Sequence, residues 1–481
     1  MKTKRIQLLF LSAFLIMYVS AQTTHPVLIE GRITNTTEKQ VTLFIADENG
    51  LGDIDTIPLQ EDGSFRYLTY RITIPQKTSL RNKDIQLNDF FIAPGYHLTI
   101  TGDGTDFLTL MKSAKIEGAE SNRYKLLHDS IMVARMDRTQ WYELKGDSLL
   151  EYIRNQKHLT DSLEKVVFHK NDTTDPYLSY FGRMTYLNNQ FQNLYFLLAA
   201  VTMKQLEEEK ACSFALETAD KTILNNLFEE EYMISDMYKT WFLSQYRTYL
   251  INKDTENNPE MENTLLYRLE KVKTGFPGKA GEYVLFNLMG GNIDTNIRTL
   301  EQLNTYRSEV EPYIASLSNE KYRQSLISAF EEKERFLKLT RVGQPALGFS
   351  LKSSTGETYS LEHFQGKVVY IDLWASWCGP CRKEIPALRA FYEKYKDDDR
   401  IEIVGIAVHD GYNDWKKALE EDKPEWLQLH DANGVVTQAY EANAIPKYIL
   451  IDKKGNIADM NAPSPGNRET LVDKLNAELN K

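Results

Sequence analysis

Three kinds of hydrophobic pattern follow one another along the chain. From about residue 26 onward, apolar and polar positions alternate, as in residues 41–45, and turn signals such as Asp62-Gly63 recur between the alternating runs. Short alternating runs bounded by turns predict half-buried strands. Residues 22–118 are therefore expected to form a small antiparallel β-sandwich.

Beyond this region the apolar period changes to that of helices. Four aromatic residues recur at intervals of three or four positions and so share one helix face: Tyr238, Phe242, Tyr246 and Tyr249. An aromatic stripe of this kind is typical of a helix packed in a core. Residues 119–338 are therefore expected to form an all-α region.

From residue 339 to 481, buried strands alternate with amphipathic helices. Residues 368–374 and 401–408 are nearly continuous apolar runs, which are typical of strands covered on both faces. The pattern predicts a helix over 385–396, a hairpin over 448–452 and 457–460, and a terminal helix over 468–479. A βαβ unit followed by a hairpin and a helix indicates an α/β layered domain. The chain is thus expected to be multidomain.

The first 21 residues carry the pattern of a secretory signal peptide. Lys2, Lys4 and Arg5 precede an apolar run over 6–19, and small residues up to Ala21 suit a cleavage site. The run has roughly 14 residues, fewer than the about 20 that span a bilayer. The sequence therefore predicts cleavage and export to the periplasm or cell envelope.

Composition narrows the choice of partners. The formal net charge is −11 at pH 7, with 42% hydrophobic and 26% charged residues. These fractions are those of a globular protein, and no basic stripe interrupts the acidic balance. Nucleic acid is therefore not an expected partner, and neither is an anionic membrane surface.

The chain has three cysteines, Cys212, Cys378 and Cys381. An exported protein that depends on disulfides for its fold carries many of them, so this fold does not depend on disulfides. Cys212 lies on a helical pattern and is expected to be a small buried apolar residue. The close pair Cys378 and Cys381 needs a chemical explanation.

The pair encloses Gly379 and Pro380, where an apolar strand ends and a helix begins. Free N–H groups and the helix dipole favour negative charge there and so stabilise a Cys378 thiolate, the species that attacks disulfides. Cys381 lies one helical turn further on and is the natural resolving thiol. A structural zinc site would need about four ligands, more than this pair supplies. A purely structural disulfide that closes so short a loop would add little to the stability of the fold. A redox role is favoured, with no metal.

Residues 374–386, WASWCGPCRKEIP, resemble thioredoxin and more closely its exported TlpA/ResA-type relatives. The resemblance extends from Val342 over about 140 residues to the C-terminus. It implies a cis-proline at Pro446 that faces the cysteines, with the backbone of Ile445 holding the substrate chain. It also implies a substrate-binding surface around the sulfurs that includes Trp377, Gly379 and Pro380.

Two carboxylates are candidates for accepting the proton of Cys381. Asp372 stands where thioredoxins place a buried acid, and Glu384 stands where TlpA/ResA-type proteins often carry an active-site glutamate. Burial would make either carboxylate a stronger base. Many exported relatives have asparagine at the position of Asp372. The lysine that pairs with the buried acid in thioredoxin is absent from residues 401–408 of this chain. Glu384 can equally be a solvent-facing helix residue, so the choice stays open.

These observations predict an exported thiol–disulfide oxidoreductase that reduces disulfides of envelope proteins through its CGPC motif. No bound cofactor is needed, but a membrane thiol electron donor is. One alternative is a thiol-dependent peroxidase, although the residues before Cys378 do not form the Pro-x-x-x-Thr-x-x-Cys motif of peroxiredoxins. The other is a redox-sensing, partner-binding protein. Residues 22–338 resemble the N-terminal extensions of envelope TlpA-like proteins, and the sequence makes no prediction of oligomeric state.

Overall fold

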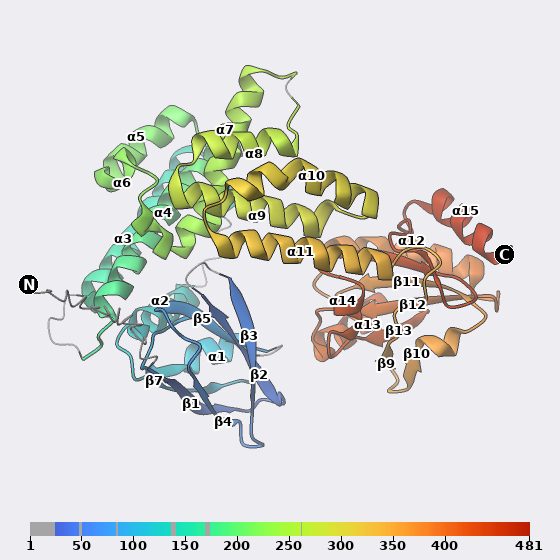
Figure 1. Ribbon diagram of the computed structural model, residues 1–481. Coiled ribbons are helices and arrows are strands. Elements are labelled where there is room, and N and C mark those ends of the chain that lie inside the picture. Colours follow the sequence, from blue (N-terminus) through green and yellow to red (C-terminus); the bar gives the residue numbers. More distant parts are fainter. Residues whose placement is uncertain (1–24, 48–50, 83–84, 136–140, 169–173, 261) are drawn as a thin grey trace, which may run out of the picture.

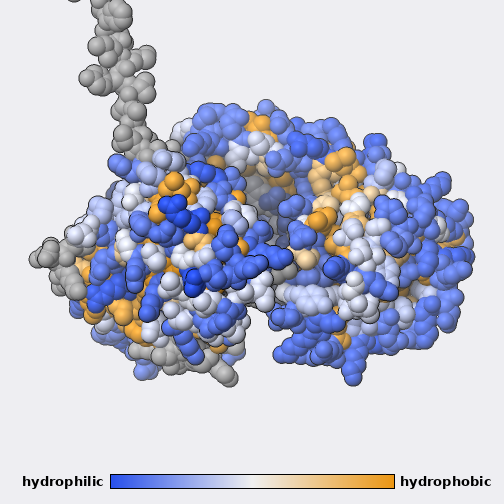
Figure 2. Space-filling view, turned by 90° about the horizontal axis from the view of Figure 1, so that it is seen from below, coloured by the Kyte–Doolittle hydropathy of each residue, from blue (hydrophilic) through white to orange (hydrophobic). Residues whose placement is uncertain are grey.

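The computed structural model describes residues 25–47, 51–82, 85–135, 141–168, 174–260 and 262–481 (Figure 1). N-terminal sheets, a central group of helices and a C-terminal α/β domain follow one another, as the sequence predicts. Seen from below, a recess separates the N-terminal sheets from the C-terminal domain (Figure 2). The expected signal peptide, residues 1–21, lies outside the described residues. Within the described ranges no helix is both long and apolar enough to span a membrane.

Two four-stranded sheets make up the N-terminal part. The first has the order β4 (Ser64–Thr69), β1 (Val27–Thr34), β7 (His97–Asp103), β8 (Lys115–Glu117); the second has the order β3 (Gly52–Pro58), β2 (Gln40–Ala46), β5 (Gln76–Arg81), β6 (Gln86–Ile92). Residues of both sheets share one apolar core, as expected of a sandwich. The expectation of purely antiparallel strands is wrong, because β1 and β7 pair in parallel. The chain visits the second sheet between these two strands, which gives it the long crossover that parallel pairing needs.

The helical elements are α1 (Phe107–Ser113), α2 (Asn122–Arg135), η1 (Trp141–Glu143), α3 (Gly146–Phe168), α4 (Leu178–Thr202), α5 (Glu208–Thr218), α6 (Lys221–Asn225), η2 (Glu230–Ile234), η3 (Met237–Phe242), α7 (Leu243–Asn257), α8 (Leu265–Gly275), α9 (Gly278–Asn296), α10 (Leu300–Ser316) and α11 (Glu320–Leu339). Tyr238 and Phe242 of the aromatic stripe are buried in the helical core, as expected. Their segment η3 is a π-helical turn that the sequence pattern did not reveal.

The expectation that Cys212 is buried is wrong: Ala211 and Phe214 occupy the inner face of α5, and Cys212 points to solvent.

The sheets and the helices are not packed as separate bodies. Leu159 and Leu163 of α3 and Phe181 of α4 belong to the same buried cluster as the strands of the sandwich. Buried polar groups add to this junction, since the Tyr96 hydroxyl donates to Asp175 at 2.6 Å. A shared core makes the first two regions one mechanical unit.

The C-terminal domain consists of β9 (Ser350–Ser353), β10 (Thr358–Ser360), η4 (Leu361–Phe364), β11 (Val368–Trp374), α12 (Gly379–Tyr395), β12 (Ile401–Ala407), α13 (Tyr412–Asp422), β13 (Leu427–His430), α14 (Val435–Ala439), β14 (Lys447–Ile451), β15 (Ile457–Asp459) and α15 (Arg468–Leu479). Its seven strands have the order β10-β9-β13-β12-β11-β14-β15. Side chains of the central strand β11 alternate between two cores, with Ile371 on one face and Tyr370 on the other. Helices cover both faces, which explains why the strand is apolar at nearly every position.

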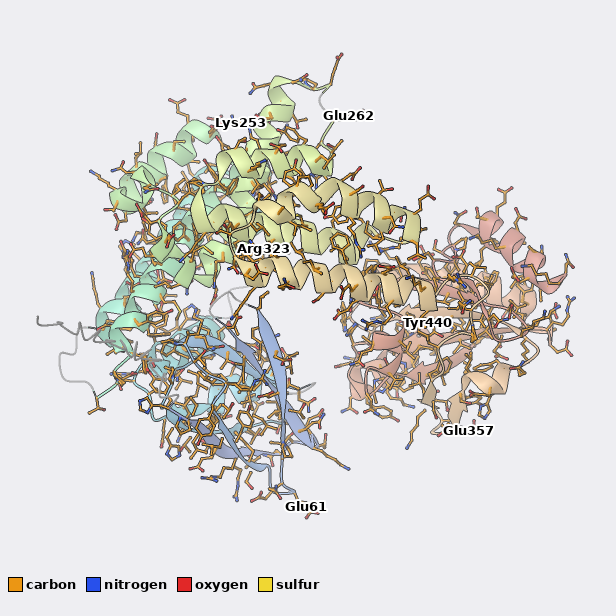
Figure 3. The ribbon with its side chains drawn as sticks, in the orientation of Figure 1. Glu61, Lys253, Glu262, Arg323, Glu357 and Tyr440 are labelled. Atoms are coloured by element: carbon orange, nitrogen blue, oxygen red, sulfur yellow. A yellow bond between two sulfur atoms is a disulfide. The ribbon has the colours of Figure 1, made fainter. Side chains whose placement is uncertain are left out.

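Helix α11 joins the helical region to the C-terminal domain. Lys333 of α11 is only 5% exposed and forms an ion pair with Glu441, at 2.6 Å. The chain after α11 then runs along the last hairpin, where the Gly343 N–H donates to the carbonyl of Ile457 at 2.8 Å. Tyr440 lies on the side of the C-terminal domain beneath the end of α11 (Figure 3). The two regions therefore meet close to the segment that leads to Pro446.

Candidate active site

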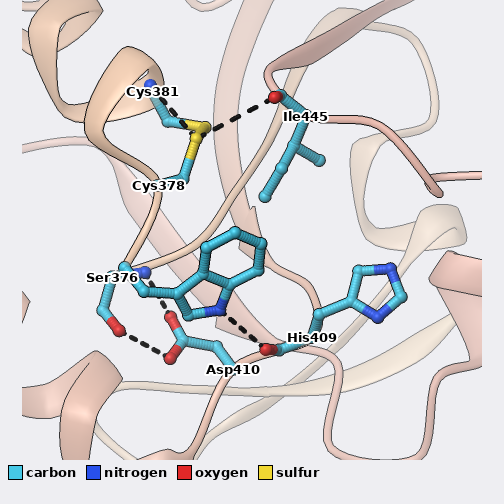
Figure 4. Close-up of a disulfide and its surroundings, with 7 residues drawn as sticks. Ser376, Cys378, Cys381, His409, Asp410 and Ile445 are labelled. Atoms are coloured by element: carbon cyan, nitrogen blue, oxygen red, sulfur yellow. Dashed lines mark hydrogen bonds between the residues drawn. A yellow bond between two sulfur atoms is a disulfide. The ribbon is translucent and has the colours of Figure 1, made fainter. Parts of the chain in front are cut away.

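Cys378 and Cys381 form a disulfide bond at the N-terminus of α12, with their Cα atoms 5.3 Å apart (Figure 4). Cys378 is the N-cap of the helix, and the backbone N–H of Cys381 donates to its Sγ atom at 3.2 Å. In the dithiol form this N–H group and the helix dipole favour a thiolate on Cys378. Both cysteines are 4% exposed. Exposure therefore does not distinguish the two sulfurs, but the position at the helix N-cap does.

The sheet topology brings a second loop to the cysteines. Strands β11 and β12 run parallel, so the residues after Trp374 and those after Ala407 meet at one edge of the sheet. The backbone N–H of Val408 donates to the Trp374 carbonyl at 2.9 Å and fixes the two chains together.

His409 and Asp410, in this second loop, hold the segment that precedes Cys378. The Asp410 carboxylate is buried and accepts hydrogen bonds from the Ser376 N–H at 2.5 Å and from its hydroxyl at 2.7 Å. The indole N–H of Trp377 donates to the carbonyl of His409 at 2.9 Å. His409 has a φ of 53°, and its ring lies 3.0 Å from the carbonyl of Ala442. The loop thus connects the cysteine motif to the segment before Pro446.

The peptide bond between Ile445 and Pro446 is cis, as the resemblance implies. The carbonyl oxygen of Ile445 lies 3.9 Å from the Sγ of Cys378. Around the disulfide, Trp377 is 64% exposed, and Gly379 and Pro380 are also exposed. The residues expected to form a substrate surface therefore lie together at the disulfide.

Asp372 is the one charged residue in the seven positions of β11 and is 8% exposed. Burial, and secondarily the charge of Glu384, raises the pKa of Asp372 to about 7. Its register partner on β14 is Tyr448, which lies in the core beneath α12. The structure therefore places on this strand a carboxyl group that titrates near neutral pH.

Glu384 is half-buried on α12, and its carboxylate accepts a hydrogen bond from the backbone N–H of Gly466 at 2.8 Å. This hydrogen bond is exposed, so the choice between a proton acceptor and a solvent-facing helix residue stays open for Glu384. The side chain ties α12 to the loop before α15 and contributes negative charge next to Asp372.

Sequence reasoning missed Asp410 and His409. Both directly follow a buried strand that runs parallel to the strand before Cys378, and this position was a signal available in the sequence. In the described part of the chain, no group of three or more His, Cys, Asp or Glu side chains is arranged to hold a metal ion.

Comparison with known proteins places the similarity in this domain. Residues 341–477 match the Redoxin family. A thiol-disulfide oxidoreductase ResA of Oceanobacillus iheyensis is 31% identical over 127 residues, which are 26% of this chain and 66% of the relative. The thioredoxin-like protein YneN of Bacillus subtilis is 28% identical over 136 residues, which are 28% of this chain and 79% of the relative.

Solved structures give similar matches. The thioredoxin domain of a thiol-disulfide oxidoreductase from Bacteroides vulgatus is 31% identical, with a TM-score of 0.26, and the match covers 28% of this chain and 96% of that one. The chain spans just under two thirds of the first ResA relatives, 66% of their length. Residues 1–340 lie outside the family match.

Proposed function

The C-terminal part of this chain is a Redoxin-family domain of the thioredoxin-like thiol–disulfide oxidoreductases, and we propose that the whole protein reduces protein disulfides through Cys378 and Cys381. One observation carries this proposal. The Sγ of Cys378 lies at a helix N-terminus, 3.2 Å from the N–H of Cys381, and 3.9 Å from the Ile445 carbonyl before a cis-proline. A sulfur so placed is stabilised as a thiolate and faces a backbone segment on which a substrate chain can lie.

In the first step, the Cys378 thiolate attacks one sulfur of the substrate disulfide. The S–S bond of the substrate breaks, a mixed disulfide forms, and the leaving substrate thiolate takes a proton from solvent. Trp377, Gly379 and Pro380 surround the site of attack, and the backbone of Ile445 holds the substrate strand.

In the second step, Cys381 loses its proton and attacks the Cys378 sulfur. The substrate leaves with its second thiolate, and the protein keeps the disulfide that the structure contains. Two electrons have then passed from the protein to the substrate. We infer that Asp372 accepts the proton of Cys381, because this carboxyl group is buried beneath α12 and burial raises its pKa to about 7. Glu384 assists by holding the Asp372 pKa up.

Asp372→Asn is expected to slow the resolution of the mixed disulfide about 100-fold at pH 8, as for other general bases. The wild-type rate should rise with pH through an inflection near 7, where the carboxyl group ionises, and the variant should lack this inflection. Stopped-flow tryptophan fluorescence over pH 5–9 measures both. The matched control is Glu384→Gln. If that variant loses the inflection while Asp372→Asn keeps it, the assignment of the base is wrong.

The same substitution should stabilise the protein. The folded state holds the Asp372 proton up to about pH 7, whereas the unfolded chain releases it near pH 4. Between these values the folded state binds more protons, so the free energy of unfolding falls as the pH rises. Asp372→Asn removes this loss, which amounts to at most about 4 kcal/mol. Urea unfolding at pH 8 should show the gain, and at pH 4 the two proteins should be alike.

We also propose that the protein works in the periplasm or cell envelope. The apolar run and small residues before position 22 support this, because they are the pattern of a cleaved signal. Its partners are then exported proteins with disulfides. Each cycle leaves the protein oxidised, so a membrane thiol electron donor must return two electrons to it.

Insulin reduction tests the proposed activity. The reduced protein, regenerated by dithiothreitol, should precipitate the insulin B chain faster than dithiothreitol alone. A protein that leaves insulin intact but consumes hydrogen peroxide would be a peroxidase instead.

A further inference from the structure

A cavity of about 650 Å³ lies between the helical region and the C-terminal domain. Helix α11 and the turn between α9 and α10 form one wall, with Arg298, Phe336 and Arg341. The segment around the cis-proline forms the other wall, with Pro446 and Lys447. We call this space the interdomain cavity.

The interdomain cavity begins next to the redox site. Pro446 lines it, and the carbonyl of the preceding residue, Ile445, lies 3.9 Å from the sulfur of Cys378. A substrate strand lying on this carbonyl extends past Pro446 within one or two residues. Side chains of such a strand would therefore lie next to the interdomain cavity while its cysteine is at Cys378.

In the part of the chain that the structure describes, three cations that line the cavity are in no ion pair with a carboxylate. The guanidinium of Arg298 donates to the backbone carbonyls at the end of α9, and the Lys447 ammonium donates to the Tyr440 carbonyl at 2.5 Å. Among the described residues, neither these two nor Arg341 forms an ion pair. Backbone carbonyls orient these side chains but do not neutralise their charge.

The acidic residues of the cavity are mostly neutralised already. Glu441 pairs with Lys333, and Asp459 pairs with Lys474. Asp294 is the remaining carboxylate of the lining, and even with its negative charge it is outnumbered by Arg298, Arg341 and Lys447. The walls therefore carry an excess of positive charge, on a chain whose net charge is −11.

The state of Lys447 agrees with this excess. Burial lowers the pKa of Lys447 to about 8, the charge of Glu441 opposes that effect, and the charges of Arg298 and Lys333 add to it. A carboxylate bound in the cavity would relieve this repulsion between cations. The site thus has the charge that an acidic side chain needs.

We propose that the interdomain cavity binds an acidic side chain of the substrate polypeptide, next to the cysteine that Cys378 attacks. The inference rests on the proposed disulfide reduction. It gives the helical region a role in that reaction: Arg298 and Arg341 select substrates with Asp or Glu beside the disulfide.

Two synthetic peptides test this inference. Both contain one intramolecular disulfide, and they differ only in having Glu or Lys on each side of the first cysteine. The reduced wild-type protein should reduce the Glu peptide with a kcat/KM at least about fivefold higher, as expected for partly buried charge pairs. The preference should shrink as the salt concentration rises toward 1 M.

Charge reversal identifies the residues. Arg298→Glu/Arg341→Glu should reverse the preference, and Arg341→Glu alone should reduce it, because Arg341 is exposed and its replacement leaves the core intact. The matched control is Lys338→Glu, on α11 but outside the cavity, which should keep the wild-type preference. All variants should reduce uncharged hydroxyethyl disulfide at the wild-type rate.

The outcomes separate the two proposals. If the wild type reduces both peptides equally, the cavity does not discriminate substrates by charge and the inference is wrong. The inference is also wrong if Arg298→Glu/Arg341→Glu keeps the wild-type preference for the Glu peptide. If the wild type reduces neither peptide nor hydroxyethyl disulfide, the proposed disulfide reduction itself is wrong, and the inference is overturned with it.

Discussion

Cys378→Ser is expected to abolish disulfide reduction, lowering the rate of insulin reduction to that of dithiothreitol alone. A serine hydroxyl at the N-terminus of α12 accepts the same N–H group of residue 381, but it cannot form the mixed disulfide. The remaining Cys381 lies within the first turn of α12, and among the described residues no backbone N–H donates to its sulfur as the N–H of Cys381 does to that of Cys378. The loss should therefore exceed about 1000-fold, as for other nucleophile substitutions.

The control for this variant is Cys212→Ser. Cys212 lies exposed on α5, outside the family match, and its replacement should leave insulin reduction unchanged. The fold should survive both substitutions, since a disulfide between residues three apart restricts the unfolded chain little. Residual activity of Cys378→Ser above the background would assign the attack to a different sulfur.

Cys381→Ser is expected to stop turnover after the first step. Cys378 then still attacks the substrate, but no thiol is present to break the mixed disulfide, so protein and substrate stay covalently joined. The complex should accumulate to nearly one equivalent and disappear on addition of dithiothreitol. Non-reducing electrophoresis and mass spectrometry of the intact complex measure it.

The double variant Cys378→Ser/Cys381→Ser serves as the control, because it should trap nothing. If Cys381→Ser trapped no substrate while Cys378→Ser did, the two roles would be reversed. The same trap, loaded with a cell-envelope extract, is also the direct route to the partner proteins.

The sequence predicted those elements whose apolar pattern, whether a continuous run or a helical period, is plain in the segment itself. Residues 368–374 form β11 as expected, because the strand lies between two cores and both faces must be apolar. The terminal helix α15 spans 468–479, as its pattern predicts. Such segments depend on their own side chains more than on distant contacts.

The start of α12 shows where local reading falls short. The apolar period predicts a helix only over 385–396, whereas the cysteine motif predicts a helix start at Cys378, and the structure has one continuous helix from Gly379 to Tyr395. Proline is well tolerated in the first turn of a helix, where its missing N–H would have no partner in any case. This first turn contains Cys381, as the motif predicts, although the apolar period alone does not extend to it.

Features set by distant contacts escaped prediction. Parallel pairing of β1 with β7 depends on a path through the other sheet, and the exposure of Cys212 depends on which face of α5 the core covers. Asp410 reaches Ser376 across 34 residues of sequence. The cysteine motif could be found because its residues are contiguous in the sequence. The residues that contact and position the motif come from other elements, so the sequence did not reveal them.

Helix α11 connects the N-terminal two thirds of the chain to the C-terminal domain. The sandwich shares its core with α3 and α4, and α11 carries the buried Lys333 that pairs with Glu441, five residues before Pro446. In the proposal above, a substrate bound at the cis-proline also contacts residues of the helical region that line the interdomain cavity, and the isolated C-terminal domain would lack these residues.

The most direct test is an equilibrium redox titration of the Cys378–Cys381 pair in the full-length protein, against dithiothreitol buffers and read by thiol alkylation. A protein that reduces disulfides should show one two-electron transition near the potential of thioredoxin, about −270 mV. A transition near about −120 mV would contradict the reductive role and indicate a protein that introduces disulfides. A pair that does not cycle at all would contradict the redox function itself.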